Sequence, residues 1–314
     1  MQVPLAPGGR ALDETLRLTA DDGVALRAGL WRGGERLALL LTGRTEFLEK
    51  AAIPAAELVA RGYTVASLDW RGQGHSDRLI DPPEKGHVGD FADYRRDLAA
   101  LMAAPEVAAL GPPALTLAHS MGAAIALESL REEVLPPAPL VLSAPMLGIA
   151  MNPALALASG LILWGARRLG RMEGWPPFGS PSVPYHRSAA FDDNMLTGDR
   201  EVWDWLSAAS RADPRLGLGM PTLAWIARAN EAMERVAGMG PLRAPALCLI
   251  GTEERVVDVR AVREGAARLG AELVEIEGGR HELLIERAPV RAAAWAGIDR
   301  FLAGGGAPDR ATSA

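Results

Sequence analysis

Near the middle of the chain the sequence reads LTLAHSMGAAIALESL from Leu115 to Leu130, and it places Ser120 where a strand runs into a helix. Residues 114–118 are almost continuously apolar, which is typical of a strand buried on both faces. Residues 121–130 are rich in Ala and Leu and predict a helix. The pattern therefore predicts a strand, a sharp turn at the serine and a helix.

A serine in such a turn needs small neighbours, because the strand and the helix approach each other closely there. Ala118 and Gly122 stand two residues before and two residues after Ser120. This spacing matches the Gly-x-Ser-x-Gly nucleophile elbow, with Ala in the first position. A serine that only caps the helix is the alternative, and this short motif alone does not separate the two.

Composition limits the classes of function. A chain of 314 residues with 49% hydrophobic content is long enough for one α/β domain with an insertion. The net charge of −6 disfavours nucleic acid as a partner. The single cysteine, Cys248, excludes an intrachain disulfide and suits a reducing compartment. The first residues lack the pattern of an export signal, so we expect a cytoplasmic location.

Apolar runs alternate with helical stretches along the chain. We expect residues 1–13 to form a loose arm and residues 24–31 to form an antiparallel edge strand. The helix after the glycine loop at Gly43 should begin near Pro54 and stop at Gly62. This alternation predicts an α/β fold with a mostly parallel, doubly wound sheet. The further strands are expected at 36–42, 64–70, 114–118, 139–143, 245–251 and 271–276, and the further helices at 89–103, 258–269 and 289–302.

The character of the chain changes after Pro145. We expect a first core part at 1–145, a helical cap at 146–225, a second core part at 226–305 and a disordered tail at 306–314. Residues 148–166 carry no charge, and Arg167, Arg168 and Arg171 follow them. Asn152 and Pro153 interrupt the apolar run, which argues against a membrane span. The stretch suits either contact with an anionic lipid surface or packing of the cap onto the core.

A nucleophilic serine needs a base and an acid from loops at neighbouring strand ends. His281 follows the strand at 271–276 and a pair of glycines, whereas the histidines at 75, 87, 119 and 186 are worse placed. Glu253, Glu254 and Asp258 follow the strand that ends at Gly251, and each is a candidate acid. The order serine, acid, histidine matches the order found in one hydrolase fold.

Five stretches carry a resemblance to a known family: LLLTGRTEFLEK, SLDWRGQGHSDR, LAHSMG, LIGTEERVVD and GGRHELLIER. Together they resemble the α/β-hydrolase superfamily, in the branch of bacterial lysophospholipases and monoacylglycerol lipases (serine aminopeptidase S33-type hydrolases). The resemblance implies the α/β-hydrolase fold, with a helical cap inserted after the strand at 139–143.

The resemblance also implies roles for individual residues. Ser120 would be the nucleophile, His281 the base and Glu254 the acid, with backbone N–H groups of Arg44 and Met121 forming the oxyanion hole. The loop from Asp69 to Ser76 matches a family loop whose role is chiefly structural. Two positions depart from the family: Thr42 and Gly43 replace a frequent His-Gly pair, and Glu254 replaces a usual Asp.

These observations predict a serine carboxylester hydrolase that cleaves a monoacyl lipid ester, either a lysophospholipid or a monoacylglycerol, through an acyl-enzyme. Acyl transfer from the same intermediate and a non-catalytic binding protein are the alternatives. Epoxide hydrolase and dehalogenase chemistry is disfavoured, because those relatives use Asp as the nucleophile. We expect no cofactor and no metal, and a lipid ester is the expected partner. The head group, the acyl length and the oligomeric state stay open.

Overall fold

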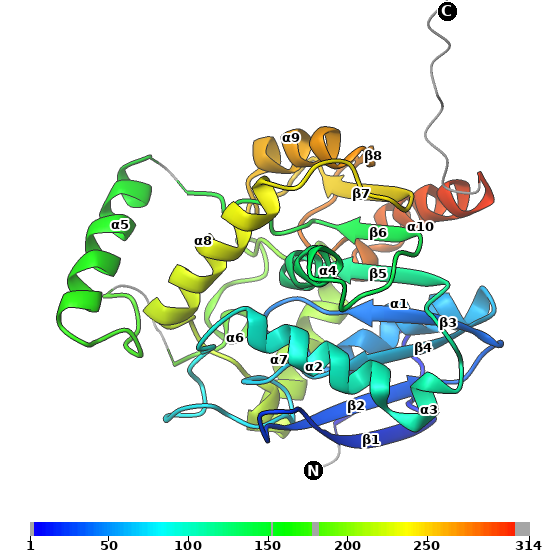
Figure 1. The fold of residues 1–314 in the computed structure, drawn as a ribbon, viewed down its shortest axis with the longest axis horizontal. Helices are drawn as coiled ribbons and strands as arrows, with labels where there is room; N and C mark the ends of the chain where they lie inside the picture. The colour runs from blue at the N-terminus through cyan, green and yellow to red at the C-terminus, as the bar shows by residue number, and fades with distance from the viewer. Residues whose placement is uncertain (1–2, 152, 178–181, 305–314) are drawn as a thin grey trace, which may run out of the picture.

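The computed structural model describes residues 3–151, 153–177 and 182–304. Its centre is one eight-stranded sheet with the order β1-β2-β4-β3-β5-β6-β7-β8 (Figure 1). The strands β4, β3, β5, β6, β7 and β8 pair in parallel with their neighbours. The pairs β1–β2 and β2–β4 are antiparallel. The bounds are β1 Glu14–Thr19, β2 Ala25–Trp31, β3 Arg36–Leu41, β4 Tyr63–Leu68, β5 Leu115–His119, β6 Leu140–Ser143, β7 Ala246–Gly251 and β8 Glu272–Ile276.

Helices cover both faces of this sheet. One apolar core joins the sheet to α2 (Ala92–Ala103), α4 (Met121–Arg131), α8 (Leu223–Ala237) and α9 (Val259–Leu269). A second core on the other face includes α1 (Leu48–Ala60) and α10 (Ala288–Ala303). The short helix α3 (Pro105–Ala108) follows α2. The predicted doubly wound α/β fold is therefore confirmed.

Two details differ from the sequence prediction. The sheet edge is β1 and not the strand at 24–31, because β2 pairs on its other side with β4. The sequence of β1, ETLRLT, alternates polar and apolar residues with half-buried apolar positions, so it lacks the apolar run that marks the inner strands. The predicted loose arm ends where this strand begins.

Helix α1 begins at Leu48, so Pro54 lies inside it and not at its first turn. The Leu48 N–H donates to Asp69 Oδ1 at 2.9 Å, which holds the start of the helix against the core. An inner proline removes one backbone hydrogen bond of the helix. The buried face of α1, with Leu48, Ile53 and Leu58, offsets that loss.

The segment between β6 and β7 is helical. It contains α5 (Pro153–Arg168), α6 (Tyr185–Ser188), α7 (Arg200–Ala212), the 3-10 helix η1 (Pro214–Leu216) and α8. Figure 1 shows α5 standing away from the sheet, whereas α7 packs on the core through Trp205, whose ring lies 6.1 Å from that of Phe47. The cap boundaries at 146 and 225 stay a prediction, and the tail at 306–314 lies outside the described residues. Among the described helices, none is long and apolar enough to cross a membrane.

Candidate active site

Ser120 occupies the turn between β5 and α4. Its backbone has φ +51° and ψ −116°, a region that side-chain-bearing residues rarely adopt. A Cβ at Gly122 would overlap the carbonyl oxygens of Leu41 and Thr42. The small residue after the serine is therefore required for α4 to approach β3, as the sequence pattern predicts.

The structure brings the predicted serine, histidine and glutamate into one hydrogen-bonded line. His281 Nε2 lies 3.0 Å from Ser120 Oγ, and His281 Nδ1 lies 2.9 Å from Glu254 Oε2. All three residues are at most 9% exposed. Each follows the carboxyl end of a parallel strand, so β5, β7 and β8 converge on a single site.

Glu254 is the only one of the three candidate acids that contacts His281 in the described structure. Its second oxygen, Oε1, accepts the N–H groups of Val256 and Val257 at 2.6 and 3.1 Å. Burial acts to raise the pKa of Glu254, but the hydrogen bonds from His281 and these amides outweigh it and lower the pKa. The carboxylate thus stays ionised beside the imidazole.

The rival acids are occupied elsewhere. Glu253 is about half exposed, with its carboxylate 3.6 Å from Arg280. Asp258 caps α9 and accepts the backbone N–H groups of Arg260 and Ala261. Of the three candidate acids, Glu254 is thus the one that lies against His281 in the described structure, and its role as the triad acid stays a prediction.

The remaining histidines bond to groups outside this line. The partners are Asp213 for His75, Thr222 for His87, the Ser143 carbonyl for His119 and Ser210 for His186. Burial lowers the pKa of each of them below the ordinary histidine value. His119 lies nearest to the site, with its ring centroid 4.8 Å from that of His281.

The loop after β3 lies directly against the serine. A Cβ at Gly43 would be 3.1 Å from Ser120 Cβ. Glu46 accepts the Gly43 N–H, and Gln73 donates to the Gly43 carbonyl at 3.0 Å. In the described part of the chain, the backbone N–H groups of Arg44 and Met121 donate to no protein oxygen. Both amides are thus free to serve the two oxyanion positions that the sequence analysis names.

A buried ionic cluster that the sequence analysis missed lies behind the serine. Lys50 Nζ contacts a carboxylate oxygen of Glu282 and lies 2.6 Å from one of Glu46. His119 Nε2 lies 3.4 Å from Glu282. Burial lowers the pKa of Lys50, but the two carboxylates outweigh it and raise the pKa above its ordinary value. The one sequence signal for this cluster is the four-residue spacing of Glu46 and Lys50, which is typical of an ion pair on a helix. Because the helix was expected to begin only near Pro54, this spacing was not interpreted as a helical pair.

The spacing of Glu46, His119 and Glu282 would allow their ligand atoms to hold a metal ion. The Lys50 ammonium, however, already lies between the two carboxylates and offsets one of their two negative charges. This donor set therefore fits an internal ion-pair cluster and does not fit a metal.

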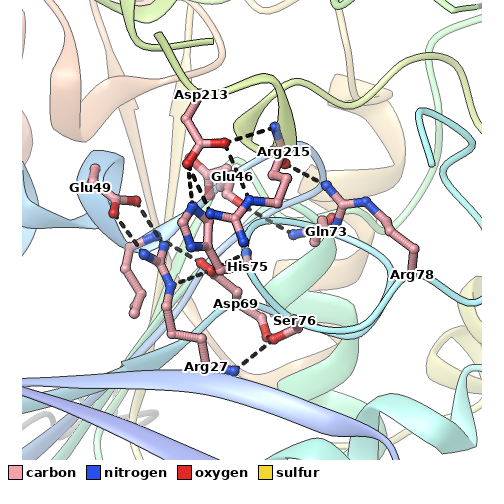
Figure 2. Close-up of polar contacts among 11 residues, drawn as sticks. Arg27, Glu46, Glu49, Asp69, Gln73, His75, Ser76, Arg78, Asp213 and Arg215 are labelled. Carbon is pink, nitrogen blue, oxygen red and sulfur yellow. Dashed lines mark hydrogen bonds and ion pairs between the residues drawn. The ribbon is translucent and has the colours of Figure 1, made fainter. Parts of the chain in front are cut away.

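The loop from Asp69 to Ser76 is held by contacts with the core and, through Gln73, with the loop after β3. Asp69 accepts hydrogen bonds from Arg27 Nε at 2.7 Å and from the His75 N–H at 2.7 Å. Figure 2 shows Arg27 between this carboxylate and that of Glu49. These contacts suit the structural role expected for this loop.

Known proteins resemble the chain over nearly its full length. The family model described as serine aminopeptidase, S33, matches residues 35–288. Lysophospholipase L2 of Escherichia coli K12 is 31% identical in an alignment over 309 residues that covers 95% of this chain and 89% of that protein. The probable lysophospholipase L2 of Haemophilus influenzae is 31% identical over 271 residues, 85% of this chain and 83% of that protein.

Among solved structures, a soluble variant of monoglyceride lipase from Saccharomyces cerevisiae superposes with a TM-score of 0.67 at 17% identity. The match covers 95% of this chain and all of that one. At this identity the superposition supports the fold alone. The family model, by contrast, spans most of the chain and includes Ser120, Glu254 and His281. The protein therefore belongs to the serine aminopeptidase, S33, family of α/β-hydrolases.

Proposed function

We propose that this protein is a serine carboxylester hydrolase that cleaves a monoacyl lipid ester. The observation that carries the proposal is the line from Ser120 Oγ through His281 to Glu254, at 3.0 and 2.9 Å. The similarity to the lysophospholipase L2 of Escherichia coli supports the lipid substrate.

The geometry supplies each step of ester cleavage. Ser120 Oγ attacks the ester carbonyl while His281 Nε2 takes its proton, and Glu254 stabilises the imidazolium through Nδ1. The N–H groups of Arg44 and Met121 receive the developing oxyanion. The imidazolium then protonates the leaving alcohol, and a water activated by His281 hydrolyses the acyl-enzyme. Transfer of the acyl group to an alcohol would use the same intermediate, but no feature of the described site favours it. The hydrogen-bonded line of Ser120, His281 and Glu254 argues against a purely binding role.

Replacement of the nucleophile tests this proposal. We expect Ser120→Ala to keep the fold and to lower kcat on a p-nitrophenyl ester by roughly 10⁶-fold, as loss of a serine nucleophile does in a protease. Circular dichroism and a melting curve provide the control for folding. More than about a hundredth of the wild-type rate in the variant would contradict the assignment of Ser120.

We further propose that α5 contacts anionic lipid surfaces from a cytoplasmic location. Leu157, Leu161 and Trp164 are 71%, 64% and 63% exposed, so they do not pack the helix onto the core. Their spacing places them along one face of the helix. Arg168 lies over the Trp164 ring at 5.3 Å, and Arg167 is 57% exposed at the same end. An apolar helical face bordered by arginines suits an anionic interface.

Co-sedimentation with vesicles that contain phosphatidylglycerol tests this contact. We expect Leu161→Ser to weaken binding, whereas Leu5→Ser, which changes another exposed leucine away from α5, should not. Activity on one monoacyl ester should also rise above its aggregation point. Equal binding by both variants would contradict the contact of α5 with lipid. Recovery of all of the protein in the membrane-free fraction of lysed cells would contradict such a contact inside the cell.

A further inference from the structure

The Arg44 side chain begins beside the nucleophile and ends between the core and the segment before α8. Its neighbour in the sequence, Gly43, packs directly on Ser120, so the Arg44 backbone lies close to the nucleophile in space. Its Nη2 donates to the Gly219 carbonyl, and its guanidinium lies 5.4 Å from the Trp225 ring. A Cβ at Gly86 would overlap this guanidinium, so the glycine leaves room for it.

The Arg44 guanidinium lacks a charged partner in the part of the chain that the structure describes. Within residues 3–151, 153–177 and 182–304, no carboxylate forms an ion pair with it, and its buried Nε has no hydrogen-bond partner. Burial lowers the pKa of Arg44 to about 10. Two other buried arginines are compensated, since Arg27 binds Asp69 and Glu49, and Arg71 binds Asp97. Arg78, like Arg44, has no carboxylate partner in the described part of the chain, but it does not lie next to the loop that packs on Ser120. An uncompensated buried cation is costly unless a ligand supplies the anion.

We propose that the Arg44 guanidinium binds the phosphodiester of a glycerophospholipid head group and so selects lysophospholipids over monoacylglycerols. This inference rests on the proposed ester hydrolysis at Ser120. In a lysophospholipid only the glycerol unit separates the cleaved ester from the phosphate, and the Arg44 side chain spans a comparable length from its backbone at the oxyanion position. The free Nε–H donor and the planar guanidinium match phosphate oxygens, which arginine binds more strongly than neutral acceptors.

The test compares two substrates with the same acyl chain, 1-acyl lysophosphatidylglycerol and 1-monoacylglycerol. The readout is the ratio of their kcat/KM values, because damage to the oxyanion loop lowers both values together. We expect Arg44→Gln, which removes the guanidinium and its charge, to lower this ratio about 10- to 100-fold, the effect of losing one charge-assisted hydrogen bond. Arg44→Lys, which keeps the charge, should lower the ratio less.

Arg78→Gln is the matched control, because Arg78 is another mostly buried arginine that donates to backbone carbonyls, those of Pro83 and Arg215. In Arg78→Gln, the ratio of the two kcat/KM values should equal that of the wild type. An unchanged ratio in Arg44→Gln, or a wild-type preference for the monoacylglycerol, would overturn the inference. Cleavage of neither substrate by the wild type would instead refute the proposed function.

A second measurement needs no variant that might lose its fold. Glycerol 3-phosphate and glycerol are compared as inhibitors of p-nitrophenyl butyrate hydrolysis by the wild-type protein. We expect glycerol 3-phosphate to compete at concentrations at least about tenfold lower than glycerol, because only the phosphate meets the Arg44 charge. Equal inhibition by the two compounds would contradict a phosphate site.

Discussion

Replacing Lys50 by methionine should destabilise the fold more than any change at a surface charge. The variant removes the ammonium that lies between Glu46 and Glu282 and leaves two buried carboxylates facing each other. All three side chains are less than a tenth exposed, so water does not replace the lost partner. Methionine has a similar length and adds no polar atom, which isolates the loss of charge.

The size of the effect follows from burial. Removing one partner of a buried ion pair costs about 3–5 kcal/mol, and this lysine serves two carboxylates. Without the lysine, mutual repulsion and burial should raise the pKa of the two carboxylates above their ordinary value in the folded variant. The folded variant therefore retains protons that the unfolded chain releases, and its stability falls as pH rises above the ordinary range of glutamate.

Urea unfolding of the wild type and of Lys50→Met at pH 5 and pH 8 measures this effect. We expect a loss of about 3–5 kcal/mol at pH 8 and a smaller loss at pH 5, and partial recovery in Lys50→Met/Glu282→Gln. Lys85, the only other lysine, lies over the Trp175 ring, and Lys85→Met is the matched control. A loss below about 1 kcal/mol, or one that does not change with pH, would show that Lys50 does not stabilise the two buried carboxylates.

Three further predictions follow from single contacts. Glu254→Ala should lower kcat/KM on a p-nitrophenyl ester by roughly 10⁴-fold and Asp258→Ala only slightly, and the reverse order would identify the wrong acid. Gly122→Ala should reduce the unfolding free energy by about 1–3 kcal/mol or more, because its Cβ overlaps the Leu41 carbonyl, and a stable, active variant would contradict this. Burial lowers the pKa of His186 to about 4, so folding stability is lost as pH falls from about 6.5 toward 4, by about 3 kcal/mol in all. His186→Gln should flatten that slope in urea unfolding curves, and an unchanged slope would assign it to other groups.

Most of the fold was predictable because inner strands of a parallel sheet are buried on both faces and therefore carry unbroken apolar runs. The strand β1 has only one packed face and was missed for the same reason. The start of α1 was misplaced because Pro54 is usually a boundary signal. Here a contact from Asp69, a residue of a distant loop, fixes the beginning of the helix at Leu48, and local sequence does not reveal such a contact.

The structure places Ser120, His281 and Glu254 together as the sequence predicts, because strand ends and motif spacing specify where their loops lie. The charges behind them were not predictable in the same way. Lys50 and Glu282 are far apart in the chain and meet only after folding. A charged side chain is usually solvated, so its burial depends on a partner that no local pattern identifies.

The most direct test of the central claim is covalent labelling of the active protein with a fluorophosphonate, followed by mass spectrometry of its peptides. We expect one adduct, on Ser120, which forms in parallel with the loss of lysophospholipid hydrolysis and is absent from Ser120→Ala. An adduct on another residue, or full inhibition with Ser120 unmodified, would contradict it.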